Sequence, residues 1–297
     1  MESTTISHNS SSNGLLGRRA AMFLGGAALA GLALPRKGAA QTSTVTDTDI
    51  LNFALNLEFL EAQFYTLATT GMTIDKIGIS TASGGGTAGG ALTVKANPMV
   101  QFSTPLLQQF AAEIALEEQN HVKFLQSALG ASAVAMPNID LLNSFNALAQ
   151  AAGLGTTFDP FASETNFLLG AFIFEDVGVT AYSGAAGLIS NTTYLDKAAG
   201  ILAVEAYHAG SIRLRIFQAG SAVQQAASAI AATRATLDGT GNDDIGVGLS
   251  GGAATIVDAD ANAIAFSRSA AQVLKVVYGG GASSGAFFPS GLNGNIK

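Results

Sequence analysis

Two four-residue stretches decide the fold of this chain. Residues 118–121 read Glu-Gln-Asn-His, and residues 205–208 read Glu-Ala-Tyr-His. In a helix, residues three apart lie one turn apart on the same face, so each stretch presents a carboxylate and an imidazole side by side. The sequence holds 3 His, and two of them have this spacing. The pattern therefore predicts two helices that each offer a pair of metal-ligating groups.

Two further stretches complete an internal repeat. Residues 58–65 and residues 175–182 each begin with Glu and end with Tyr, two helical turns later on the same face. In chain order the sequence reads Glu…Tyr and then Glu-x-x-His, and this order occurs twice. A site built from four helices, with one Glu from each of two and a Glu-x-x-His from each of the others, is the pattern of a dinuclear carboxylate bundle.

The repeat also settles which acidic residues correspond. Glu117 could pair with His121 across four residues, but the second half offers only the three-residue spacing, so Glu118 is the preferred partner. Glu61 has no counterpart, because Gly178 stands at its position in the second half. We therefore expect Glu61 to be either an extra metal ligand or a carboxylate on the entry path.

Hydrophobic periodicity predicts the elements that carry these residues. Apolar side chains recur at intervals of three and four, which predicts long helices over about 47–69, 103–129, 163–188 and 193–219, and shorter ones over 138–152, 221–237 and 269–278. Residues 71–98 are rich in Gly, Ser and Thr and predict a long connection with a short strand at 91–94. Four long helices with one extended connection in the middle indicate a bundle with a crossover.

The two ends of the chain differ from the helical middle. Arg18 and Arg19 precede an apolar run over 20–34 and the small residues 38–40, an order typical of an export signal. The paired arginines favour the twin-arginine route, and the general secretory route stays open. The run is shorter than the roughly 20 residues of a membrane-spanning helix, so we expect an exported protein, periplasmic or extracellular, without an integral membrane segment after cleavage.

The expected organisation is therefore a signal peptide over 1–40, a helical domain over 45–238 and a tail over 239–297. The tail is rich in Gly, Ala, Asn and Asp, and residues 287–294 read Phe-Phe-Pro-Ser-Gly-Leu-Asn-Gly. Because two adjacent phenylalanines are unsuited to a flexible linker, we expect the tail to pack along the helices.

Composition excludes several classes of function. The net charge is -7, so a basic surface for nucleic acid is absent from the sequence. The chain has 0 Cys, which excludes disulfides, thiolate metal sites and cysteine nucleophiles. Any chemistry must use carboxylates, imidazoles and hydroxyls.

The repeated pattern resembles the ferritin-like di-iron carboxylate superfamily. The likeness is closest to exported ferritin-like proteins called desiccation-related, judged from residues 51–58 (Leu-Asn-Phe-Ala-Leu-Asn-Leu-Glu), the export signal and the ending at 287–294. The resemblance implies an all-α fold: a ferritin-like four-helix bundle with a crossover connection, extra helices and a Gly-rich C-terminal tail.

The resemblance also implies a set of ligands and a cofactor of two Fe or two Mn ions. The implied ligands are Glu58, Glu118, His121, Glu175, Glu205 and His208, with Glu118 and Glu205 as bridges. Tyr65 and Tyr182 are either hydrogen-bond donors to these ligands or ordinary core residues. Asp176 and Glu117 are adjacent to ligands and are expected to point elsewhere, into solvent or behind a ligand.

Two classes of function follow from this reading. The leading one is a dinuclear oxidoreductase that oxidises Fe(II) or consumes peroxide or oxygen. The alternative is a non-catalytic structural or stress-protective protein. An iron-storage cage is disfavoured, because long loops and a tail obstruct a tight symmetric shell, while a smaller homo-oligomer stays open.

Overall fold

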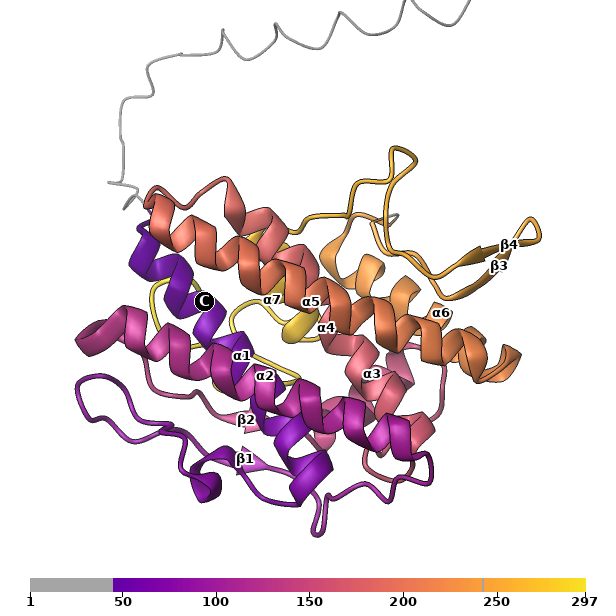
Figure 1. The fold of residues 1–297 in the computed structure, drawn as a ribbon, viewed down its shortest axis with the longest axis horizontal. Coiled ribbons are helices and arrows are strands. Elements are labelled where there is room, and N and C mark those ends of the chain that lie inside the picture. Colours follow the sequence, from indigo (N-terminus) through magenta and orange to yellow (C-terminus); the bar gives the residue numbers. More distant parts are fainter. Residues whose placement is uncertain (1–44, 242) are drawn as a thin grey trace, which may run out of the picture. The chain divides into compact units, whose positions relative to one another are not determined.

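The computed structural model describes residues 45–241 and 243–297, so the predicted export signal lies outside the described residues. This part of the chain forms seven α-helices (Figure 1): α1 (Asp47–Thr70), α2 (Pro105–Leu129), α3 (Asn143–Ala151), α4 (Glu164–Ala186), α5 (Thr192–Gln218), α6 (Ser221–Asp238) and α7 (Ala270–Val277). Single 3₁₀ turns cover Ile74–Ile77 and Gly130–Ser132. The predicted all-α class is confirmed.

Four short strands accompany the helices. Strand β1 (Leu92–Thr93) pairs in parallel with β2 (Ile139–Asp140), and β3 (Gly248–Ser250) forms an antiparallel hairpin with β4 (Ala253–Thr255). The β1–β2 pair joins the long connection after α1 to the crossover after α2. In the described part of the chain, no helix is long and apolar enough to cross a membrane.

The bundle consists of two antiparallel helix pairs. Helix α1 packs along α2, and α4 packs along α5 after a connection over 187–191, while α1 also contacts α4. Residues 130–163, which include β2 and α3, carry the chain from one pair to the other (Figure 1). This is the predicted crossover.

Helices α1 and α4 form the centre of the molecule because they are apolar on nearly every side. Almost every side chain of α1 from Ile50 to Ala68 is buried, and so is most of α4 from Phe167 to Tyr182. Helices α2 and α5 instead bury one face and leave the other exposed. The polar residues on α1 and α4 therefore lie in the core whichever way they point.

Local sequence sets the ends of these helices. Thr46 caps α1 through a capping box with Asp49, and Gly71 ends it in the left-handed conformation. The predicted helix over 138–152 begins later than expected, at Asn143. The Asp140 carboxylate accepts hydrogen bonds from the backbone N–H groups of Leu142 and Asn143 at 2.8 and 2.7 Å, and residues 139–140 pair with β1 instead.

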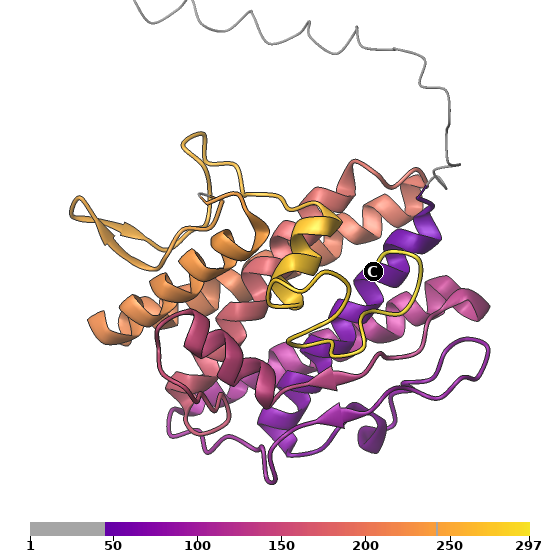
Figure 2. The same cartoon turned by 180° about the vertical axis from the view of Figure 1, so that it is seen from behind.

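The C-terminal tail packs against α1. The backbone N–H of Asn293 donates to the Asn56 side chain at 3.0 Å, and the Asn56 amide donates back to the Asn293 carbonyl at 2.9 Å. Phe287 and Phe288 are fully buried. Figure 2 shows this segment lying across the helices from behind. The tail thus covers apolar surface that the four bundle helices leave open.

A buried network of ion pairs fastens residues 243–268 to the bundle. Asp176 on α4 accepts from Arg213 at 2.8 Å and from Arg234 at 2.7 Å, and Arg234 also pairs with Asp244 at 2.7 Å. Arg268 pairs with Asp244 and with Asp238, and it donates to Thr180. The three arginines are almost completely buried. The expectation that Asp176 points into solvent or behind a ligand is therefore wrong, because Asp176 is a buried acceptor in this network.

The Arg234→Met variant tests the network. Removing one member of a buried ion pair leaves its partners charged and unpaired, which costs about 3–5 kcal/mol. We expect this loss in the free energy of unfolding, measured by urea denaturation, together with earlier proteolysis within 239–268. The control, Lys197→Met on α5, removes an exposed pair with Asp196 and should change stability little. A parent-like Arg234→Met protein would contradict the role of the network.

Candidate metal centre

The structure brings all six predicted ligand residues together in the bundle core. One ligand atom from each of Glu58, Glu118, His121 and Glu205 lies within 4.8 Å of the others, and the same holds for Glu118, Glu175, Glu205 and His208. Glu118 and Glu205 belong to both groups, which is the geometry expected of bridging carboxylates. Each of the four bundle helices supplies at least one member.

Several of these groups have no hydrogen-bond partner. Six buried side-chain atoms in the described part of the chain are unpaired, and five of them lie in this cluster: Glu118 Oε1, Glu175 Oε2, Glu205 Oε1, Glu205 Oε2 and His208 Nδ1. A buried polar atom without a partner costs about 1–3 kcal/mol, and more when it is charged. Such a concentration of unpaired ligand atoms has the chemistry that a bound cation would satisfy.

Two tyrosines hold the outer oxygens of the cluster. Tyr65 on α1 donates its hydroxyl hydrogen to Glu175 Oε1 on α4, and Tyr182 on α4 donates to Glu58 Oε1 on α1. The bonds therefore cross between the two central helices. In each carboxylate the second oxygen faces an imidazole. Of the two roles predicted for the tyrosines, the structure shows that of hydrogen-bond donors that orient these carboxylates.

Gly178 makes room for the centre. A Cβ atom at this position would collide with Glu205 Oε2 and would lie 3.1 Å from Glu205 Cδ and 3.5 Å from Glu61 Oε1. The repeat breaks here because a side chain on α4 would occupy the space of the Glu205 carboxylate. Glu61 is buried beside this gap, but its oxygens do not belong to either group of converging ligand atoms.

Burial dominates the titration of the carboxylates. It raises the pKa of Glu205 and of Glu61 well above the usual range, and the neighbouring carboxylates add to the effect. Burial also raises the pKa of Glu58 to about 7, although His121 opposes the shift. Glu118 is the exception. Its burial is outweighed by the hydrogen bond from His121 and by the positive charge of both nearby imidazoles, which hold its pKa well below the usual range.

The imidazoles respond in the opposite sense. Burial alone would lower their pKa values, but the surrounding carboxylates raise the pKa of His121 to about 11 and that of His208 to about 12. Without a metal ion, protons therefore supply the positive charge that the carboxylates require.

Glu117 contacts the cluster from outside. Its Oε2 atom lies 2.6 Å from His208 Nε2, on the ring edge opposite the cluster. The side chain is 39% exposed, so it connects the buried imidazole to the surface between α2 and α5. Glu117 thus lies behind a predicted ligand, which was one of its two expected positions. The identity of the partner, His208, could not be predicted, because the two residues are 91 positions apart and lie on different helices.

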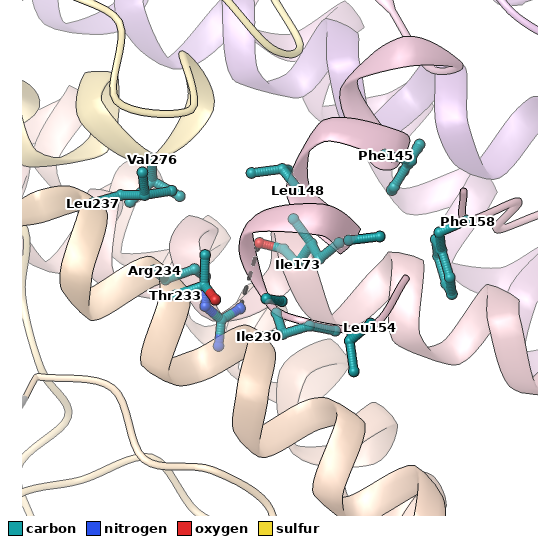
Figure 3. A pocket seen from close by; sticks show the side chains of 12 residues that line it. Phe145, Leu148, Leu154, Phe158, Ile173, Ile230, Thr233, Arg234, Leu237 and Val276 are labelled. Carbon is teal, nitrogen blue, oxygen red and sulfur yellow. Dashed lines mark hydrogen bonds between the residues drawn. The ribbon is translucent and has the colours of Figure 1, made fainter. Parts of the chain in front are cut away.

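A separate apolar pocket lies between α3, α4, α6 and α7 (Figure 3). Figure 3 shows Thr233 and Arg234 as its polar members, and the Arg234 guanidinium is already paired with Asp176 and Asp244. The other lining residues are almost all apolar, among them Phe145, Leu148, Ile173, Ile230 and Val276. This pocket contains none of the predicted site residues and no free acid or base, so it is not the candidate centre.

The metal-free protein should lose stability as the pH rises from 5 to 10. Above the ordinary Glu pKa, the folded state keeps protons on the raised carboxylates that the unfolded state releases. Above about 6.5, it also keeps protons on both imidazoles, up to their folded pKa values of about 11 and 12. Each excess proton contributes a slope of about 1.4 kcal/mol per pH unit.

Urea unfolding in the presence of a chelator measures this slope. The low pKa of Glu118 acts only below this window and leaves the sign unchanged. A free energy of unfolding that is flat or rises between pH 5 and pH 10 would show that the cluster is not buried as described.

Comparison with known proteins places this site in a family. Residues 46–218 match the model of a ferritin-like domain, and these residues span all four bundle helices. The chain is 30% identical over 248 residues to the desiccation-related protein PCC13-62 of Craterostigma plantagineum, covering 77% of this chain and 76% of that protein.

A second relative is the ferritin-like catalase Nec2 of Nesocodon mauritianus, with 28% identity over 269 residues and 84% of each chain covered. The search of solved structures gave no significant match. The family match covers more than half of the chain and agrees with the four-helix geometry of the buried Glu and His residues. The chain belongs to the ferritin-like domain family.

Proposed function

We propose that this protein is an exported dinuclear metalloprotein that consumes hydrogen peroxide. The ligands are Glu58, Glu118, His121, Glu175, Glu205 and His208, and they hold two Fe or two Mn ions. The observation that carries the proposal is the group of five unpaired buried ligand atoms at the centre of the bundle.

The residues fit two divalent cations in charge and in chemistry. Four ionised carboxylates carry four negative charges, which two divalent ions balance. Carboxylate oxygen and imidazole nitrogen suit Fe and Mn alike. Each half of the cluster offers oxygen from three carboxylates and one imidazole nitrogen. With one oxygen from each carboxylate, each half would supply four ligand atoms, fewer than the six of octahedral coordination, which would leave room for a small molecule.

Peroxide is the favoured substrate because one of the relatives is named a ferritin-like catalase. When bound, two redox-active ions would supply two electrons to one peroxide molecule and would regain two electrons from a second peroxide molecule. The chain must supply proton transfer, since peroxide accepts protons when it is reduced to water and releases them when it is oxidised to oxygen.

Glu61 is the group placed to carry these protons. Its carboxyl lines a small cavity beside Gly178, with about 20 Å³ of room for the centre of a water-sized molecule. That is enough for one water or one comparably small neutral molecule. The other lining side chains are apolar: Leu57, Leu60, Ile173, Phe174, Val177, Val276, Val277 and Phe287. The cavity admits a small uncharged substrate and excludes bulk water from the cluster.

A non-catalytic protective protein is the second candidate. It is favoured by the 30% identity to a protein named desiccation-related. In that case the metal ions would stabilise the bundle and would not turn over. Both candidates require bound metal, and only the first requires peroxide consumption.

Metal content and its effect on unfolding test the ligand assignment. The purified protein should contain two Fe or Mn ions per chain by elemental analysis. Removing them should lower the free energy of unfolding by about 2.7 kcal/mol for each site that was held at 100 times its dissociation constant. His208→Ala should lose metal and keep its helical content. Tyr207→Ala, at the neighbouring residue with 74% exposure, should behave as the parent. A parent without metal and without a response to added Fe(II) or Mn(II) would refute the centre.

Glu61→Gln separates catalysis from metal binding. The variant should keep two ions and the parent's stability in the metal-loaded form, because Glu61 is not among the converging ligands. Its rate of peroxide consumption, followed by oxygen release, should fall about 10²–10⁴-fold, the usual contribution of a proton-transfer group. The exposed variant Glu113→Gln is the control. A metal-loaded parent that releases no oxygen from peroxide would favour the protective protein instead.

A further inference from the structure

The two halves of the cluster are not equivalent. Nδ1 of His121 lies within hydrogen-bonding distance of two carboxylate oxygens, at 3.2 Å from Glu58 Oε2 and 3.2 Å from Glu118 Oε2. Nδ1 of His208 lies 3.0 Å from Glu118 Oε1 and 3.3 Å from Glu175 Oε2, but among the described residues it has no partner with hydrogen-bond geometry. The pseudo-symmetric sequence thus folds into an asymmetric site.

The residues that belong to only one half differ in their pairing: Glu175 Oε2 and His208 Nδ1 are unpaired, whereas Glu58 and His121 have no unpaired buried side-chain atom. The other unpaired atoms of the cluster belong to Glu118 and Glu205, which both halves share. In the other half, Glu118 Oε2, Glu58 Oε2 and the His121 ring are hydrogen-bonded to one another. An ion entering the His121 half must first break these contacts, whereas an ion entering the His208 half meets ligand atoms without partners.

Glu117 adds a second, independent difference. It holds Nε2 of His208 at 2.6 Å and so fixes the ring with Nδ1 facing the cluster. In the sequence repeat the residue equivalent to Glu117 is Val204, which cannot hold His121 in this way. In the described part of the chain, every acidic partner of His121 lies on Nδ1.

A carboxylate behind a ligating imidazole strengthens metal binding. It fixes the ring orientation, keeps the remaining proton on the outer nitrogen and makes the ligating nitrogen more basic. Loss of such a partner typically weakens metal binding 10- to 100-fold. Here this support exists on one side of the centre.

We propose that the two metal positions load in a fixed order. The first ion binds between Glu118, Glu175, Glu205 and His208, with Glu117 as the positioning residue, and the second binds at the His121 position. This inference rests on the proposed dinuclear centre. It adds a stable form of the protein with one bound ion, which two equivalent halves would not favour.

Titration of the full chain with Mn(II) tests the order, with free Mn(II) followed by its electron paramagnetic resonance signal. The parent should bind two ions in two steps at least tenfold apart in affinity. Glu117→Gln should weaken the first step 10- to 100-fold and leave the second near the parent's value. Glu113→Gln is the matched control, since it makes the same change one turn earlier on α2 at an exposed position.

A second measurement locates the first ion. In protein labelled with ¹⁵N-histidine, one equivalent of diamagnetic Zn(II) should shift the Nδ1 resonance of His208, and a second equivalent should shift that of His121. The histidine signals are assigned with His121→Ala and His208→Ala.

The outcomes separate the inference from the proposed function. Two equal steps, an unchanged Glu117→Gln titration, or a shift of His121 at the first equivalent would each overturn the loading order and leave the dinuclear centre intact. Absence of Mn(II) binding by the parent would overturn both.

Discussion

Five carboxylates buried at the centre of one helix bundle are the constraint that shapes this molecule. Glu58, Glu61, Glu118, Glu175 and Glu205 are all nearly inaccessible to water. Moving even one unpaired charge out of water costs several kcal/mol, so like charges held this close require positive charge, protons or hydrogen-bond donors nearby. Two imidazoles and two tyrosine hydroxyls provide some of the positive charge and hydrogen bonds. Four carboxylate oxygens of Glu118, Glu175 and Glu205 still have no hydrogen-bond partner.

The molecule contains a second set of buried carboxylates, whose negative charge is balanced by arginine side chains. Around Asp176, three arginines pair with the acidic residues of α4, α6 and the C-terminal tail. Asp176, Asp244 and Asp258 also approach one another closely enough to hold an ion. Arginine already satisfies Asp176 and Asp244, however, whereas no arginine of residues 45–241 and 243–297 pairs with the Glu cluster. The difference explains why we assign a structural role to one acidic group and propose the other as the cation site.

The sequence predicted the features that repeat or that follow helical spacing. The helices, the crossover and the convergence of the Glu and His residues follow from intervals of three, four and seven residues. The arginine network does not, because its partners are 37 and 58 residues apart and lie on different helices. The contact between Glu117 and His208 is hidden for the same reason. The late start of α3 depends on one aspartate side chain and a two-residue strand, which periodicity does not detect.

The junction between Asn56 and Asn293 has a consequence for biosynthesis. The segment that closes the core is synthesised after all four bundle helices, while Asn56, which it binds, lies on the first of them. Before then, the apolar surface of α1 near Leu57 and Leu60 has no Phe287 to cover it. The core can therefore be closed only after residues 287–293 have been synthesised. A chain cut just before Phe287 would be made with an incomplete wall beside Glu61, although every residue of its cluster would be present.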